Sequence, residues 1–310
     1  MKIVFMGTPD FAVPSLEALV EEKHDIVQVF TQPDRPKGRG NKLTMPPVKE
    51  KALEHNLKVC QPHSLKNTEI VNIIKNLNPD LIVVVAYGQI LTKEVLAIPP
   101  LGCINVHASL LPKYRGAGPI QWAIINGEKT TGITTMYMGE GLDTGDMILK
   151  EEIFIGENET AEELHNRLSL LGGKVLKGTL LQIDKGTAPR VRQNHEESTY
   201  APRLTKELGN IQWNKTAEEI HNLIRGTIPW PMAYTNYLDK TMKIWKSGIE
   251  KGNGSNEPGK IIEVTKDKII VATGKDSLAI EELQFSGGKR LAVKDFLVGN
   301  TIEKNIILGS

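Results

Sequence analysis

The sequence has little cysteine, and what it has is not spaced for covalent or metal chemistry. Among 310 residues only Cys60 and Cys103 are present, and no C-x-x-C spacing occurs. A disulfide framework and a cysteine zinc site are therefore not expected. The seven histidines include no H-x-x-x-H or H-E-x-x-H spacing, so a histidine metal site is not expected either. We expect a protein of a reducing compartment that uses no metal.

Long apolar runs and a charge excess are also missing. No stretch approaches the roughly 20 consecutive apolar residues that a membrane helix needs. The first residues, "MKIVFMGTPDF", form a strand pattern instead of a charged and apolar leader, so we expect a cytoplasmic protein. The formal net charge is +1, which means that any binding of nucleic acid has to rest on local charge.

A dinucleotide fingerprint is missing at the place where it would be found. In "FMGTPDF" a strand pattern turns into a helix pattern, but Gly7 is the only glycine of the turn. Without the second glycine of G-x-G-x-x-G, the backbone has no usual way to approach a pyrophosphate, which argues against a nicotinamide-dependent oxidoreductase. We expect Gly7 and Pro9 to form a strand-to-helix turn beside the site.

The pattern that is present predicts two domains. In the first half, short β-branched runs alternate with helical segments, which is typical of βαβ units: strands at 2–5, 25–31, 57–60, 80–86 and 102–106, helices at 15–22, 48–55, 68–77 and 120–126. We predict an α/β fold with a doubly wound, mostly parallel, Rossmann-like sheet over residues 1–185, whose site lies beyond the carboxyl ends of its strands. A polar linker follows at 186–206. Short strands spaced by turn residues then predict a small antiparallel OB-like barrel over 207–310.

An asparagine and a histidine lie two residues apart in "INVHASLLPKYRGAGP", at the end of one predicted strand. Because side chains two apart on a strand share a face, Asn105 and His107 point to the same spot. An amide can stabilise a developing oxyanion, and an imidazole can donate to it or move protons. The pair can equally satisfy hydrogen bonds at a strand end. The rigid loop that follows favours the chemical interpretation.

A second candidate element is "GEGLDTGDM". Its three glycines let the backbone approach a ligand closely while Asp143 presents a carboxylate, with Asp146 nearby. A glycine-rich hairpin turn with solvated acids is the plain alternative. A carboxylate facing His107 would orient the imidazole and relay protons.

These motifs together resemble the folate-dependent formyltransferase family. The similarity to the family rests on "INVHASLLPKYRGAGPIQWAIINGE" and "GLDTGD". The chain particularly resembles the family members that act on methionyl-tRNA in three further segments: "MGTPDFAVPSLEAL", "TQPDRPKGRGNKL" and "STYAPRLTKE". The resemblance implies 10-formyltetrahydrofolate as the formyl donor and the α-amino group of methionine on initiator tRNA as the acceptor. It assigns catalysis to Asn105, His107 and Asp143. It assigns folate contacts to three segments: Ser109, Leu110, Leu111 and Pro112; Tyr87, Gly88, Gln89, Ile90 and Leu91; Gly139 and Gly141.

Local positive charge indicates where a tRNA would bind. The segment from Thr31 to Leu43 carries four cations against the single acid Asp34, and its glycines and prolines suit a mobile loop that orders on phosphates: Arg35, Lys37, Arg39 and Lys42. A solvated charged face is the plain alternative. In similar enzymes this insertion reaches the acceptor end, with an arginine matching Arg39.

The C-terminal domain is only slightly basic, and its candidates for phosphate contacts are Lys243, Lys246, Lys289 and Arg290. Trp213, Trp230 and Trp245 can stack on bases, but burial in the barrel core is the expected use.

Rival functions share parts of this pattern. A formyltransferase for an amino-sugar nucleotide would have the same three catalytic residues but has no need of the cationic segment. A glycinamide ribonucleotide formyltransferase would be shorter and would lack the barrel, and a non-catalytic tRNA-binding protein would not need Asn105, His107 and Asp143 together. We expect a monomer that binds neither DNA nor a membrane.

Overall fold

The computed structural model describes residues 1–37, 40, 42–252 and 257–309 and forms two compact units. The first unit contains Met1–Pro119, Thr130–Phe154 and His165–Ala201. The second takes Ile120–Lys129, Ile155–Leu164 and the chain from Pro202 onward. The second unit therefore includes two short pieces that interrupt the first unit along the sequence.

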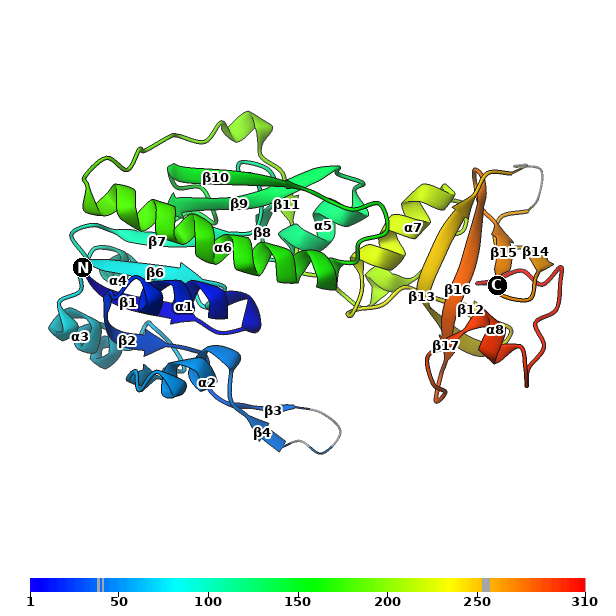
Figure 1. Ribbon diagram of the computed structural model, residues 1–310, viewed down its shortest axis with the longest axis horizontal. Helices are drawn as coiled ribbons and strands as arrows, with labels where there is room; N and C mark the ends of the chain where they lie inside the picture. The colour runs from blue at the N-terminus through cyan, green and yellow to red at the C-terminus, as the bar shows by residue number, and fades with distance from the viewer. Residues whose placement is uncertain (38–39, 41, 253–256, 310) are drawn as a thin grey trace. The chain divides into compact units, whose positions relative to one another are not determined.

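The first unit is built on a seven-stranded sheet in the order β10-β9-β7-β6-β1-β2-β5 (Figure 1). The strands are β1 (Lys2–Gly7), β2 (Asp25–Phe30), β5 (Val59–Cys60), β6 (Leu81–Val85), β7 (Cys103–His107), β9 (Thr130–Tyr137) and β10 (Met147–Phe154). The first five are parallel, and β9 and β10 are antiparallel additions at one edge. The predicted doubly wound, mostly parallel sheet is confirmed. Its order reverses between β1 and β6, where such sheets bind ligands at their carboxyl edge.

Helices cover both faces of this sheet. On one face, α3 (Thr68–Leu77) and α4 (Lys93–Leu96) pack against β1, β6 and β7 through a shared apolar cluster. On the other face lie α1 (Val13–Glu21) and α6 (Ala161–Asp184), which Figure 1 shows together in front of the strands. Gly172 of α6 faces Val106 of β7 closely enough that a side chain there would press on it. All five residues of β6 are buried, as expected for a parallel strand covered on both sides.

Local signals in the sequence account for the helix ends. Asn67 caps α3 by accepting a hydrogen bond from the Glu69 amide, and Thr160 and Glu163 form a capping box before α6. The remaining helices are α2 (Pro47–Glu54), α5 (Pro119–Ile125), α7 (Ala217–Gly226) and α8 (Val293–Phe296), with 3-10 turns at Asp10–Ala12, His195–Glu197 and Glu207–Gly209. Gly7 is needed for packing, because a Cβ there would meet Phe5, Ala12 and the Val85 carbonyl. The expectation of a tight strand-to-helix turn is confirmed.

The cationic segment was expected to be a loop, and this is wrong for its described part. β3 (Arg35–Lys37) and β4 (Lys42–Thr44) pair as an antiparallel hairpin. Two short extended runs around "GRGN" are sufficient for a hairpin, and Pro36 is tolerated because this pair has no further strand beside it. Asp34 anchors its base: both carboxylate oxygens accept from Lys49 Nζ, and one accepts from Gln61 Nε2. These hydrogen bonds, that of Gln61 first, lower the pKa of Asp34.

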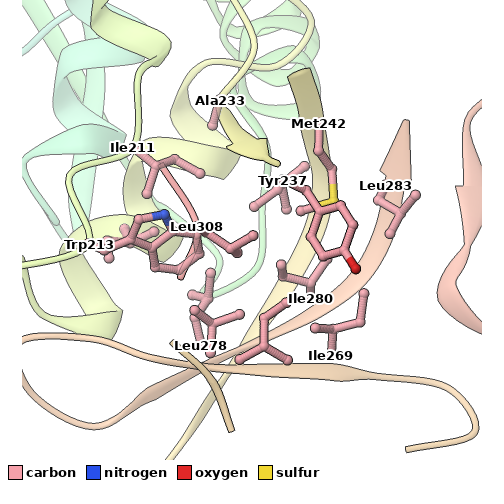
Figure 2. Close-up of a cluster of buried hydrophobic side chains, with 14 of the residues drawn as sticks. Ile211, Trp213, Ala233, Tyr237, Met242, Ile269, Leu278, Ile280, Leu283 and Leu308 are labelled. Atoms are coloured by element: carbon pink, nitrogen blue, oxygen red, sulfur yellow. The ribbon is translucent and has the colours of Figure 1, made fainter. Parts of the chain in front are cut away.

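The second unit contains a curled antiparallel sheet in the order β12-β13-β16-β15-β14, with β17 beside β16. Its strands are β12 (Tyr234–Tyr237), β13 (Lys240–Glu250), β14 (Ile261–Val264), β15 (Ile269–Ala272), β16 (Ser277–Phe285) and β17 (Leu291–Ala292). Figure 2 shows side chains from the sheet and from the preceding segment gathered into its core. Trp213 belongs to this core and donates its indole N–H to Thr235, as expected of a buried tryptophan. Trp230 is half exposed, so its expected burial is wrong. The sheet is the predicted small C-terminal barrel, half closed.

Candidate active site

Asn105 and His107 lie on one face at the carboxyl end of β7, the face that also carries Cys103. Asn105 is half-buried, and its side-chain amide has no hydrogen-bond partner among the described residues. Polar groups in such positions are usually satisfied, so this amide has its full capacity free for a ligand. The plain interpretation, that Asn105 only completes hydrogen bonds at a strand end, is not what the geometry shows.

His107 is held rigidly and is only 6 % exposed. Its Nε2 lies 2.9 Å from the carbonyl oxygen of Tyr114. A carbonyl can only accept, so Nε2 carries a proton and donates it there. Only Nδ1 therefore remains for chemistry, and it faces the Asp143 carboxylate, with 3.7 Å between Nδ1 and Oδ2. That separation is too long for a hydrogen bond, so Asp143 acts on the ring through its charge.

Asp143 reaches His107 from the loop between β9 and β10. In the antiparallel register, Tyr137 at the end of β9 lies beside Ile104, so the loop returns along β7 to bring Asp143 near His107. The backbone of Asp143 is left-handed, with φ 51°, and its Oδ2 accepts a 2.8 Å hydrogen bond from the Gly116 amide. Gly145 is required by packing, because the Tyr137 carbonyl occupies the space of a side chain there. Asp146 uses its backbone carbonyl to accept from the Tyr137 amide.

The S-L-L-P segment is fastened to the antiparallel edge of the sheet. The Thr134 hydroxyl accepts from the Leu111 amide and donates to the Ser109 carbonyl, and Lys150 donates to the Leu111 carbonyl. The side chains of Ser109 and Leu111 are fully buried, the latter against Met136 and Met147. Leu110 and Pro112 are half-buried. In this arrangement Ser109 and Leu111 shape the loop, whereas Leu110, Pro112 and the backbone are what a ligand can contact.

The segment after β6, residues 87–91, also combines buried residues with exposed ones. Tyr87 and Leu91 are buried, and burial raises the pKa of the Tyr87 hydroxyl, which finds no hydrogen-bond partner in the described part of the chain. Gln89 is used within the chain, accepting from the Leu65 amide and donating to the Pro62 carbonyl. Gly88 has a positive φ at the turn, and Ile90 is 84 % exposed. Ile90 and the backbone are thus the parts of this segment that can contact a ligand.

An ion pair of 2.9 Å between Lys93 and Glu140 joins this segment to the glycine-rich loop. In that loop a side chain at Gly139 would meet nothing within 4 Å, and Leu142 is exposed. Gly141 is instead packed against Thr144. Each of the two loops therefore carries an exposed apolar side chain, Ile90 in one and Leu142 in the other.

Two residues that hold this site were missed by sequence reasoning. Gln193, from the predicted linker, is buried and contacts the Asp143 loop, and Arg115 contacts Gln193. Nothing in the spacing of "RVRQNHEE" indicates a buried glutamine, and the pattern of the loop after β7 does not show that Arg115 is buried.

The candidate tRNA contacts fall on the hairpin of the first unit and on the curled sheet of the second. Arg35 and Lys42 are exposed on the hairpin, Lys37 lies in β3, and Arg39 lies outside the described residues. On the curled sheet, Lys243 and Lys289 are exposed, whereas two candidates already have acidic partners. Lys246 pairs with Glu281 at 3.0 Å, and Arg290 pairs with Glu282 at 2.6 Å while covering the ring of Trp245.

The described residues contain no group of three or more histidine, cysteine, aspartate or glutamate side chains arranged for a metal ion. Among the helices described, none is both long and apolar enough to cross a membrane.

Comparison with known proteins accounts for both units. A family model described as formyl transferase matches residues 1–180, and one described as formyl transferase, C-terminal domain, matches residues 203–301. The chain is 64 % identical over 309 residues to methionyl-tRNA formyltransferase of Alkaliphilus oremlandii, covering 100 % of both chains. It is 58 % identical to the protein of the same name from Clostridioides difficile, again over 100 % of both. Among solved structures, an N-formyltransferase from Helicobacter canadensis in complex with folinic acid and dTDP-3-aminofucose is similar in fold. That match has a TM-score of 0.67 and 23 % identity and covers 90 % of this chain and 99 % of the other.

Proposed function

The chain belongs to the formyl transferase family, and on that premise we propose that it formylates initiator methionyl-tRNA. It transfers the formyl group of 10-formyltetrahydrofolate to the α-amino group of the esterified methionine, giving N-formylmethionyl-tRNA. The assignment of methionyl-tRNA as the acceptor rests on the 64 % identity to a methionyl-tRNA formyltransferase along the whole chain. The solved sugar formyltransferase shares the fold at only 23 % identity, which says nothing about the acceptor.

The free hydrogen-bonding groups of the site suit acyl transfer. The folate supplies a formyl group on nitrogen, whose oxygen gains negative charge when an amine attacks the carbon. The Asn105 amide donates to that oxygen, and it can do so because none of the described residues hydrogen-bonds to it. His107 donates to the same oxygen from Nδ1, since its Nε2 is committed to Tyr114.

Asp143 has two tasks in this proposal. Its carboxylate, 3.7 Å from Nδ1, orients the His107 ring, and its φ of 51° and the Gly116 amide hold it in that place. It also helps to pass the proton of the attacking amine to the departing nitrogen of the folate. No metal takes part in these steps.

The folate is bound by the exposed parts of the three segments around this edge. Leu110 and Pro112, Ile90, and the open backbone at Gly139 form the surface that we propose for it. These residues fit such a ligand, because a reduced folate combines flat apolar rings with hydrogen-bonding edges, and pockets of this kind pair apolar walls with few polar groups. This surface is supported by the residues of the same segments that are packed or hydrogen-bonded within the chain: Ser109, Leu111, Tyr87, Gln89, Leu91 and Gly141.

The tRNA is bound outside the catalytic edge. We propose that Arg35, Lys37 and Lys42 of the hairpin, together with Arg39, which lies outside the described residues, contact the acceptor end and that the second unit contacts the backbone elsewhere. Lys243 and Lys289 come first there, since Lys246 and Arg290 would have to exchange glutamate partners for phosphates. In this proposal residues 1–185 catalyse, 186–206 link the two parts and also contribute Gln193 to the site, and 207–310 bind tRNA. The protein works as a cytoplasmic monomer without contact to DNA or membranes.

The decisive experiment compares acceptors. Radiolabelled 10-formyltetrahydrofolate is incubated with the protein and charged initiator tRNA, free methionine or an amino-sugar nucleotide, and the label is followed into each. We expect label in the charged tRNA alone. Label in the amino sugar alone would show that the acceptor is wrong while the chemistry is right, and no transfer to any acceptor would reject the activity itself.

A further inference from the structure

Residues 191–201, here called the docking segment, lie against both loops of the site within the first unit. Val191 and Met147 exchange two backbone hydrogen bonds of 2.8 and 3.0 Å. At its other end, β11 (Tyr200–Ala201) runs parallel to β8 (Arg115–Gly116), and Figure 1 shows the two side by side. The segment that the sequence presents as a linker is therefore part of the scaffold of the site.

Gln193 lies between these two attachments with every polar atom of its side chain in use. Its Oε1 accepts from Arg115 Nε at 3.0 Å and from Nη2 at 2.7 Å. Its Nε2 donates to the carbonyls of Asp143 at 2.9 Å and Gly145 at 2.8 Å. The orientation of this amide is certain on chemical grounds, because a guanidinium only donates and a carbonyl only accepts. Turning the amide over would break all four contacts.

Both residues of this hydrogen-bonded bridge, Gln193 and Arg115, are buried. Gln193 is 6 % exposed and Arg115 is 9 % exposed. The described residues offer Arg115 no carboxylate within ion-pair distance; besides Gln193, the one described hydrogen-bond partner of its side chain is the ring of His195, 3.2 Å from Nη1. A buried guanidinium that ends on a neutral amide is uncommon, since buried charges are usually paired with an opposite charge. The Arg115 guanidinium therefore fixes the position of the Gln193 amide against the Asp143 loop.

The side chain and the backbone carbonyl of Asp143 both depend on the adjacent residues Arg115 and Gly116. Its carboxylate accepts from the Gly116 amide, and its carbonyl is tied through Gln193 to Arg115. The left-handed φ of Asp143 is unfavourable for a residue with a side chain and persists only where its surroundings enforce it. We propose that Gln193 is a positioning residue for catalysis: through Arg115 it holds the Asp143 loop so that the carboxylate stays beside His107. The inference rests on the proposed formyl transfer.

Two substitutions of Gln193 separate positioning from simple packing. Gln193→Met fills the same space but removes all four hydrogen bonds. Gln193→Glu keeps an acceptor for Arg115 and adds a charge partner for it, but sets an oxygen against the Asp143 and Gly145 carbonyls. The matched control is Asn194→Ala, because Asn194 is the next residue of the docking segment and bonds only within 194–197.

Steady-state kinetics in the full-length protein gives the first readout. We expect both Gln193 variants to lose roughly tenfold to a hundredfold in kcat, the scale of an ångström-sized misplacement, with KM for charged tRNA unchanged. Asn194→Ala should match the wild type. If Gln193→Glu is as stable to urea as the wild type and still slow, loss of packing cannot be the cause. Wild-type kcat in both variants, or losses that disappear after correction for the unfolded fraction, would overturn the proposal.

Hydrogen exchange of the backbone gives a second readout that needs no activity. We expect faster exchange at residues 140–147 in both Gln193 variants and unchanged exchange in Asn194→Ala. If the wild type proves inactive on charged tRNA, the proposed function fails, and the exchange data still decide whether Gln193 holds the loop. Unchanged exchange in an active enzyme would reject the bridge alone.

Discussion

Asn105→Ala separates catalysis from folding more cleanly than any other change at this site. The Asn105 amide has no partner within the described chain, so its removal breaks no internal hydrogen bond. The residue lies in β7 between Val84 of β6 and Met136 of β9, and alanine can keep both pairings. We therefore expect the free energy of unfolding to change by less than about 1 kcal/mol, the full range of strand propensity.

The effect on turnover should be much larger. Removing one donor to a developing oxyanion typically costs about 2.7–4 kcal/mol of transition-state stabilisation, which is about 10² to 10³ in kcat. His107 is a less clear probe, because its loss would also remove the hydrogen bond to the Tyr114 carbonyl, and a typical hydrogen bond contributes about 0.5–1.5 kcal/mol to stability.

Formyl transfer to charged initiator tRNA, measured beside urea unfolding, tests this reasoning. Asn72→Ala, at an exposed position in α3, is the matched control and should change neither quantity appreciably. A folded Asn105→Ala protein with a near-normal kcat would refute the assignment of Asn105 as an oxyanion donor. An unfolded protein would instead show that the amide has a structural role that its free hydrogen bonds do not suggest.

Three further changes have effects that follow from the structure. Burial lowers the pKa of His221, so the unfolded chain takes up a proton more readily than the folded protein, and the free energy of unfolding should fall as the pH drops below about 6.5. In His221→Gln that pH slope, measured by urea unfolding, should be smaller; an equal slope would mean that His221 does not contribute. Gly145→Ala forces a Cβ onto the Tyr137 carbonyl and should destabilise the protein by about 1–3 kcal/mol and lower kcat with it, as melting and kinetics will show. Lys289→Glu should weaken tRNA binding and reduce the slope of log affinity against log salt by about one or more, whereas an unchanged slope would place the tRNA elsewhere.

Sequence patterns predicted the architecture because they follow from local physics. An apolar run such as that of β6 is stable only between two covering layers, and the capping residues at Thr160 and Asn67 mark helix starts by their own hydrogen bonds. The hairpin at 35–44 was mistaken for a loop because its strands are three residues long and their pairing is not visible in so short a pattern.

The sequence by itself also determined which groups share a face of β7, since alternation places Asn105 and His107 on one side of any extended chain. What only the tertiary structure decided is which of their atoms are free: Nε2 of His107 is committed to Tyr114, and the Asn105 amide to nothing described. It likewise decided that Gln193, 50 residues after Asp143 in the chain, holds that loop. Such contacts join segments whose separation carries no periodic signal, so they exist only once the sheet and its loops have brought the partners together.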